Sequence, residues 1–168
     1  MHTANVVAAW AVTTTDRIRD GIARAGMDPR ELAALTLVAT HDGCSLDWLR
    51  QRIGLTQSGT VRLVDRLSGK QQIRRGSSTG RGVPLHLTET GQQYLREWQG
   101  VQSDIVDGLL AGLTTDQRDA LVAGLARALA TQERARPEAD ATCRTCTWDA
   151  CRPECPVDRS VRGPEDAP

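Results

Sequence analysis

The chain has 168 residues, which suffice for one domain of ordinary size with a tail or arms, but hardly for two full domains. Hydrophobic residues make up 39% of it, with four Trp, one Tyr and no Phe, so the core must be built largely from Leu, Val, Ile and Ala, as in packed helices. The formal net charge is zero, and no apolar stretch approaches the roughly 18 residues of a membrane span, which excludes a membrane-spanning helix.

The apolar run at residues 6–12 has no basic region before it and no cleavage-like site after it, so we expect no signal peptide, no membrane partner and a cytoplasmic location. Apolar residues recur at spacings of three and four over residues 5–25, which predicts an amphipathic helix. A second helix opens at Asp28, which can serve as N-cap before Pro29 at the first helical position and Glu31 at the third.

Two short helices follow in a helix-turn-helix arrangement. Ser45 can cap the first, Gly54 can close it in a left-handed conformation, and Thr56 can cap the second. The inner face predicted for this second helix consists of Val61, Val64 and Leu67.

After Gly69 the pattern changes to short extended runs at residues 72–75 and 83–87, joined by a Gly/Ser/Thr-rich stretch at 76–82. This indicates a β-hairpin with a basic tip. Thr88 then caps a long helix, and a capping box at residues 114–117 opens another, which ends at Pro137.

The order of these elements and two motifs resemble the MarR family of bacterial transcription regulators. Residues 55–67, followed by 73–75, are similar to the recognition helix and first wing strand of the family. Residues 85–91, Leu-His-Leu-Thr-Glu-Thr-Gly, contain the L-T-x-x-G that leads from the wing into the next helix. The resemblance covers roughly residues 5–135. The wing tip departs from the family pattern, because Arg81 is its only candidate for the minor-groove arginine.

The resemblance implies a mainly α protein: a winged helix-turn-helix with N- and C-terminal dimerisation helices and a short β-hairpin wing. We expect a MarR-like domain at 1–136, in which 28–97 form the DNA-binding head and 5–27 with 98–136 the dimerisation helices, and a cysteine-rich metal-binding tail at 137–168. The expected function is transcriptional regulation, with repression as the expected sign. The partner would be double-stranded DNA, with each subunit of a homodimer binding one half-site of a palindromic operator.

The charge distribution fits a DNA-binding head. Residues 46–82 hold eight basic side chains and only two acidic ones, whereas residues 97–119 are acidic. We expect base contacts in the major groove from Gln57, Ser58, Thr60 and Arg62. We expect phosphate contacts from Arg66, Lys70, Arg74 and Arg75, and from the free N–H groups beside Thr56.

Four cysteines in the tail follow the pattern C-x2-C-x4-C-x3-C: Cys143, Cys146, Cys151 and Cys155. In an intracellular protein this clustering favours thiolate metal ligands over disulfides, although an oxidation switch stays open. An iron–sulfur cluster and Zn²⁺ both accept four thiolates, and the C-x3-C-P ending favours the cluster. The cluster would make the protein a sensor of iron, oxygen or redox state. The lone Cys44 is interpreted as a small buried hydrophobe.

No enzymatic activity is expected, because His2, His41 and His86 are scattered and belong to no catalytic constellation. Two alternatives remain open beside metal sensing. A small aromatic effector could bind between the head and the dimerisation helices, with Trp10, Trp48 and Trp98 as candidate walls; or the tail could be a docking arm for another protein.

Overall fold

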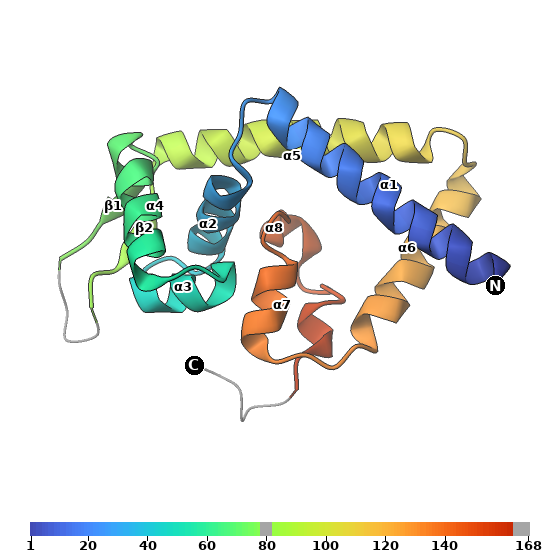
Figure 1. The fold of residues 1–168 in the computed structure, drawn as a ribbon. Coiled ribbons are helices and arrows are strands. Elements are labelled where there is room, and N and C mark those ends of the chain that lie inside the picture. Colours follow the sequence, from blue (N-terminus) through green and yellow to red (C-terminus); the bar gives the residue numbers. More distant parts are fainter. Residues whose placement is uncertain (78–81, 163–168) are drawn as a thin grey trace.

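The computed structural model describes residues 1–77 and 82–162 (Figure 1). It is mainly helical with one two-stranded antiparallel sheet, which confirms the predicted fold class. Among the described residues, no helix combines the length and the apolar character that crossing a membrane requires. The elements are α1 (His2–Arg24), α2 (Pro29–Thr40), α3 (Leu46–Ile53), α4 (Gln57–Gly69), β1 (Ile73–Arg75), β2 (Leu85–Leu87), α5 (Glu89–Leu110), α6 (Thr115–Ala130), α7 (Arg136–Thr142), α8 (Trp148–Cys151) and the 3-10 helix η1 (Asp158–Ser160).

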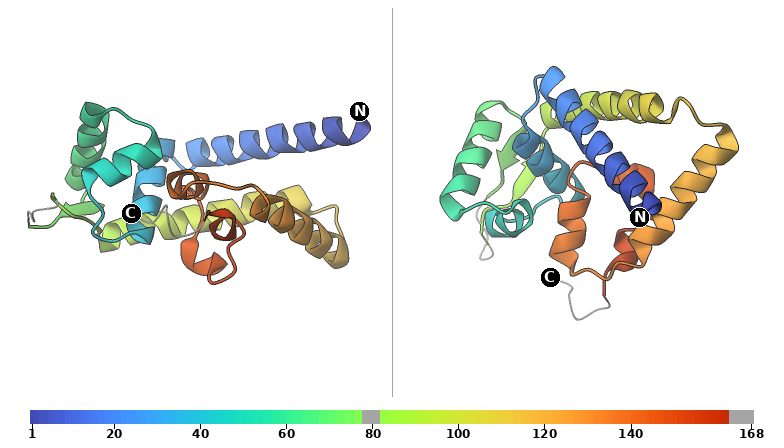
Figure 2. Two further views of the ribbon diagram at one scale, coloured as in Figure 1. Left: turned by 90° about the horizontal axis from the view of Figure 1, so that it is seen from below. Right: turned by 45° about the vertical axis from the view of Figure 1, so that its right-hand side comes forward.

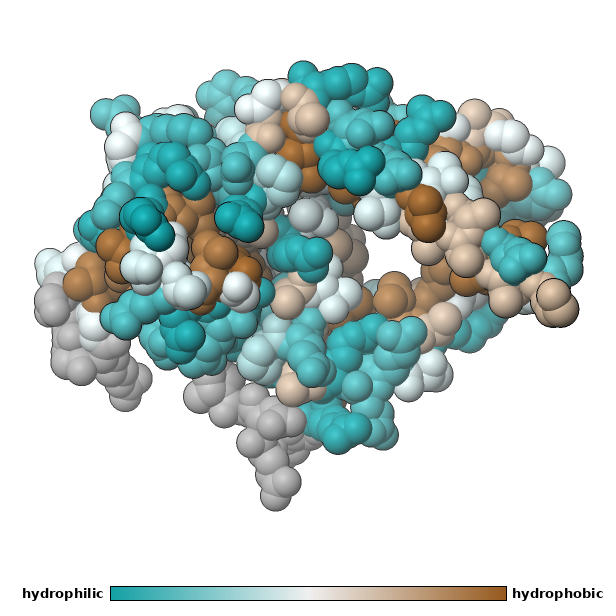
Figure 3. All heavy atoms as spheres, in the orientation of Figure 1, coloured by the Kyte–Doolittle hydropathy of each residue, from teal (hydrophilic) through white to brown (hydrophobic). Residues whose placement is uncertain are grey.

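The head consists of α2, α3, α4 and the β1–β2 hairpin, and the long helices α1 and α5 run away from it side by side (Figures 1 and 2). Helix α6 turns back at the far end of α5. The tail then returns toward the head, so that α7 lies against α3 and η1 against α6. The space-filling view shows an opening between the arms and the tail (Figure 3).

Local hydrogen bonds start the helices where the sequence predicts. The Asp28 carboxylate accepts from the backbone N–H groups of Arg30 and Glu31 at 2.8 and 3.0 Å. Gly54 closes α3 with a φ of 64°, the left-handed conformation expected of it. Side-chain caps also begin α3, α4, α5 and α6, at Ser45, Thr56, Thr88 and Thr114.

Apolar side chains from every element of the head form its core, including Leu35, Val38, Leu49, Leu63, Val64, Leu67 and Leu85. A second cluster joins α1, α2 and α5 through Ile22, Met27, Leu32 and Trp98. The wing strands pair in register, with Ile73 opposite Leu87, so this short sheet is anchored in the core by its buried residues.

The predicted inner face of α4 is partly wrong. Val64 and Leu67 are fully buried, but Val61 is 36% exposed, and Thr60 occupies the inward position instead. The burial of Thr60 is compatible with its hydroxyl, which donates to the Thr56 carbonyl oxygen one turn earlier at 3.1 Å. The face of α4 that points away from the core is therefore rotated relative to the prediction.

Candidate nucleic-acid interface and cysteine tail

The first two turns of α4 present a mixed polar and apolar surface. Gln57, Ser58 and Arg62 are exposed, as predicted for residues that contact bases. Together with Thr56 and Val61, they line one shallow hollow. Thr56 is occupied as the cap of α4, because its hydroxyl accepts from the Gly59 N–H at 3.2 Å.

Two predicted features of this surface need correction. Thr60 is only 1% exposed, so its predicted base contact is wrong. Val61, which the sequence placed in the core, instead lies among the exposed side chains of the hollow. A sequence signal for this burial does exist. Thr60, Leu63 and Leu67 follow one another at spacings of three and four, so they mark the buried face if a threonine is allowed among the apolar residues.

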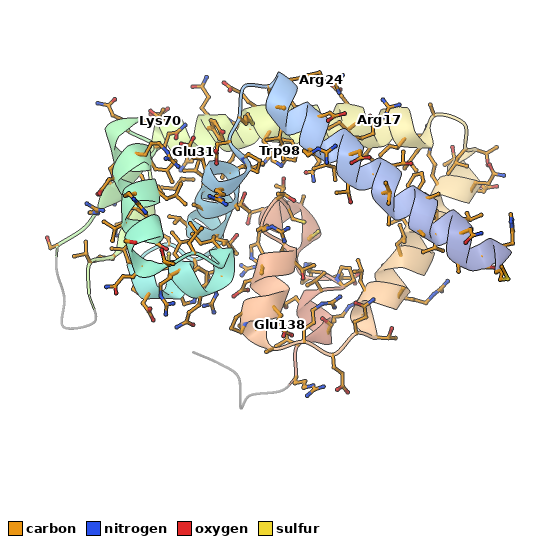
Figure 4. The ribbon with its side chains drawn as sticks, in the orientation of Figure 1. Arg17, Arg24, Glu31, Lys70, Trp98 and Glu138 are labelled. Carbon is orange, nitrogen blue, oxygen red and sulfur yellow. The ribbon has the colours of Figure 1, made fainter. Side chains whose placement is uncertain are left out.

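Ion pairs hold most of the predicted phosphate-binding cations. The buried Glu31 carboxylate of α2 accepts from Arg66 Nε at 2.8 Å. It also accepts from Lys70 Nζ at 2.6 Å, and Figure 4 labels Glu31 and Lys70. About half of each cationic side chain stays exposed, at 52% and 49%, so both can still face a phosphate while Glu31 fixes their direction. Arg75 pairs with Asp65 at 2.6 Å.

The remaining predicted cations are Arg74 and Arg81. Arg74 is exposed on β1. The predicted minor-groove arginine, Arg81, lies outside the described residues.

One basic residue counted with the head is buried against the tail. Arg52 of α3 is buried, and its Nε donates to Asp140 Oδ2 of α7 at 2.7 Å. Burial opposes ionisation of Asp140, but the nearby His41 ring and the hydrogen bond from Arg52 outweigh it and lower the pKa of this carboxyl. The pair joins residues 88 positions apart in the chain, and no local pattern in the sequence signals it.

The four tail cysteines influence one another. A hydrogen bond with the Cys146 thiol, burial and the nearby Cys155 thiol raise the pKa of Cys143. The same bond lowers the pKa of Cys146 to about 7, despite burial. Burial, together with the thiols of Cys155 and Cys146, raises the pKa of Cys151. These shifts indicate that the thiols lie near one another. Within residues 1–77 and 82–162, however, no group of three or more His, Cys, Asp or Glu side chains is placed so that it could hold a metal ion.

Cys44 differs from the tail cysteines. It packs beside the core of the head, and burial raises the pKa of its thiol to about 12. A thiol that stays protonated at neutral pH is a poor nucleophile and a poor metal ligand. This agrees with its interpretation as a small hydrophobe.

A cavity of about 560 Å³ opens between α2, the wing, α5 and the tail. Its lining includes Trp98 and Trp148 beside the polar side chains of Arg96 and Gln99. Of the three predicted tryptophan walls, Trp98 alone is in this lining. Its indole N–H donates to the Thr145 carbonyl oxygen at 2.9 Å, so the tail forms one side of the cavity.

No protein-family model matches the sequence. Over 105 residues the chain is 27% identical to the uncharacterized HTH-type transcriptional regulator YkoM of Bacillus subtilis (strain 168), a match that covers 61% of this chain and 68% of that protein. The structure is similar to a MarR family protein from Bacillus stearothermophilus, with a TM-score of 0.64 and 18% identity over 74% of this chain and 88% of the other. It is also similar to the MarR family protein Rv2887 of Mycobacterium tuberculosis in complex with p-aminosalicylic acid, with a TM-score of 0.57 and 18% identity over 73% and 94% of the two chains. The fold of this chain is thus the winged helix fold of the MarR-family transcriptional regulators.

Proposed function

We propose that this chain is a homodimeric transcriptional regulator, a repressor, that binds a palindromic operator in double-stranded DNA through one winged head per half-site. The observation that carries the proposal is the first half of α4, where Gln57, Ser58 and Arg62 are exposed on a helix whose other face is locked in the core. The N-terminal turns of such a helix fit the major groove, where an arginine can make a bidentate contact to guanine.

The exposed apolar side chains of the long helices favour contact with a second subunit. Within the described residues, these side chains gather on α1, α5 and α6: Val6, Val7, Val12, Val106, Val122 and Leu125. Exposed apolar residues on neighbouring helices favour association. A two-fold dimer formed there would present two heads to two half-sites.

DNA binding is tested by selecting duplexes from a random pool and then titrating them at several salt concentrations. Arg62→Ala should weaken binding and relax specificity at one base pair, at a cost of roughly 1–3 kcal/mol. Arg17→Ala is the matched control, because it removes the same charge from the exposed face of α1, away from the head (Figure 4). The proposal fails if no duplex is enriched and no salt-dependent binding is measured.

We further propose that Cys143, Cys146, Cys151 and Cys155 hold an iron–sulfur cluster, through which the regulator senses iron, oxygen or redox state; Zn²⁺ is the alternative. The mutual interaction of the four thiols supports a shared ligand. Metal binding would require the cysteine side chains to move, because no group of three or more His, Cys, Asp or Glu among the described residues is placed to hold a metal ion.

Metal content and a visible spectrum after anaerobic purification distinguish these cofactors. A cluster gives visible absorbance with bound iron and sulfide, whereas colourless protein with stoichiometric zinc rejects it. Cys146→Ala and Cys151→Ala should abolish binding of either metal and leave the head folded, while Cys44→Ala should bind metal normally. Protein that holds neither metal would remove the tail from the sensing proposal.

The 560 Å³ cavity favours a small aromatic acid as a second candidate effector. Trp98 and Trp148 offer apolar walls, and Arg96 offers a cation for a carboxylate. Rv2887 binds p-aminosalicylic acid in a structure of similar fold. Titration of this chain with p-aminosalicylic acid, followed by operator binding, tests the candidate, and Arg96→Gln should weaken any response.

A further inference from the structure

The tail is fastened to the reading head by a buried ion pair. Arg52 lies in the last turn of α3 and Asp140 lies in α7, and their side chains are only 4% and 5% exposed. Helix α7 runs beside α3 in Figure 1. The two side chains of such a buried ion pair cannot easily move apart, because separating them leaves an uncompensated charge in the protein interior. The two helices that carry them should therefore move together.

Both partners are further constrained by their surroundings. Arg52 Nη1 donates to the Trp48 carbonyl oxygen at 3.2 Å, and its guanidinium lies 3.8 Å from the centre of the Trp48 ring. Asp140 is also approached by His41 Nε2 at 3.6 Å and by Arg136 Nη1 at 3.9 Å. The carboxylate therefore has a fixed place among three basic groups from α3, α7 and the end of α2.

This contact is adjacent to the turn of the helix-turn-helix. Arg52 is two residues before Gly54, which ends α3 and leads into the cap of α4 at Thr56. A displacement of Arg52 therefore displaces the turn that sets the angle of α4, on which Gln57, Ser58 and Arg62 are exposed.

On the other side, Asp140 is close to the cysteines. It lies in the last turn of α7, three residues before Cys143 at the end of that helix. The loop from Cys143 to Cys146 is held a second time, at Thr145, whose carbonyl oxygen accepts from the buried indole of Trp98 in α5. A change at this loop thus has a direct mechanical path to α3 through one turn of helix.

We infer that Asp140 is a positioning residue, which sets the orientation of α4 through Arg52. Through the same contact it transmits changes at the Cys143–Cys146 loop to the proposed DNA-binding surface. The predicted effect of Asp140 on DNA affinity rests on the proposed DNA binding, whereas its predicted effect on α3 is independent of that proposal. Ligation of the thiols would move α7, and the ion pair would carry that movement into the turn before α4. Because coupling is reciprocal, DNA bound to the head would change the metal affinity of the tail by the same factor.

The test compares full-length wild type with Asp140→Asn, which removes the charge and keeps the side-chain shape. Glu138→Gln is the matched control, since it makes the same chemical change on the exposed side of α7. Arg52→Met combined with Asp140→Leu replaces the pair by apolar side chains, which keeps the site filled if Asp140→Asn alone unfolds. Each protein is measured with chelator and with added Zn²⁺, by amide hydrogen exchange of residues 46–53 and by affinity for the selected operator.

In wild type and in Glu138→Gln, Zn²⁺ should change the exchange of α3 and shift operator affinity by about 5- to 150-fold. In Asp140→Asn and in the double variant, Zn²⁺ should still bind, but both responses should vanish, and operator affinity should fall by about tenfold relative to a random duplex. Equal responses in wild type and Asp140→Asn would overturn the inference, as would a wild type in which bound Zn²⁺ leaves α3 unchanged or in which Zn²⁺ does not bind. If α3 responds as expected but no duplex is bound, the proposed function fails and the positioning role stands.

Discussion

The glycine that ends the L-T-x-x-G motif has a specific structural reason, which Gly91→Ala tests. Gly91 is buried in the first turn of α5, beneath the start of the wing. A Cβ atom there would overlap the backbone carbonyl oxygen of Gln72 and would lie 2.7 Å from Leu87 Cδ1. That carbonyl cannot easily move, because it accepts the Thr88 N–H at 3.1 Å at the junction of wing and helix.

The expected cost follows from these contacts. Overpacking a filled site costs about 1–3 kcal/mol, and a clash with backbone places Gly91→Ala near the upper value. The better helix propensity of alanine returns about 1 kcal/mol, so the net destabilisation should be about 2 kcal/mol. For a domain of this size, that lowers the melting temperature by roughly 4–8 °C.

Gly100→Ala is the control, because it lies in the same helix, is exposed and has no atom within 4 Å of its added Cβ. It should gain about 1 kcal/mol from propensity alone. Thermal and urea unfolding at one fixed protein concentration measure both variants. If Gly91→Ala proves as stable as Gly100→Ala, the close approach of wing and helix does not constrain this motif as argued.

Three further predictions concern the reading surface, the paired cations and the buried thiol. Val61 is exposed among the polar residues proposed to read bases, so it should contact the methyl group of one operator dT. Replacing that dT by dU removes the methyl group and should cost about 0.8 kcal/mol, about fourfold in affinity. Val61→Ala should abolish this difference, and an operator that tolerates dU equally at every position would contradict the contact. Glu31→Gln should destabilise by about 1–2 kcal/mol in urea unfolding, since one buried carboxylate serves two half-exposed cations, whereas the exposed Glu97→Gln should change stability by less than about 0.5 kcal/mol. The Cys44 thiol has an ordinary pKa of 9.0 that burial raises to about 12, so the unfolded chain releases this proton first and stability falls between those two pH values. Between those pH values the free energy of unfolding of Cys44→Ala should fall less steeply than that of wild type, by up to about 1.4 kcal/mol per pH unit. If plots of unfolding free energy against pH are parallel for the two proteins, the thiol is not buried and protonated.

Most helix boundaries could be predicted because they depend on neighbours in the chain. The end expected at Pro137 is wrong, since α6 ends at Ala130 and Pro137 lies in the first turn of α7, where a proline needs no hydrogen-bonded N–H. The cap at Asp28 bonds to N–H groups two and three residues ahead, and Gly54 needs only its own positive φ. These interactions are complete within one turn, so their residue types mark them without knowledge of the rest of the fold. The wing and the long helices followed from changes in hydrophobic period in the same way.

Three features could not be predicted from apolar pattern and charge alone. The rotation of α4 is one: a valine is more apolar than a threonine, yet Thr60 is inside, and its hydroxyl is satisfied by its own helix. The pairing of Arg52 with Asp140 is another, since charge alone assigned Arg52 to the basic face. The grouping of Glu31 with two cations of α4 likewise appears only when α2 and α4 meet.

These pairings bear on how a chain of zero net charge would present the proposed DNA-binding surface. Five cations of the head form ion pairs within the protein, two of them with the single Glu31 carboxylate: Arg50, Arg52, Arg66, Lys70 and Arg75. In the described part of the chain, Arg62 and Arg74 form no ion pair and are exposed. A head with few free cations gains little from phosphates in general, because non-specific affinity grows with the number of phosphates that are neutralised. Under the proposed function, affinity for DNA would depend more heavily on side chains that distinguish bases. The position of α4, and hence the tail contact that holds α3, would then be the property on which binding depends.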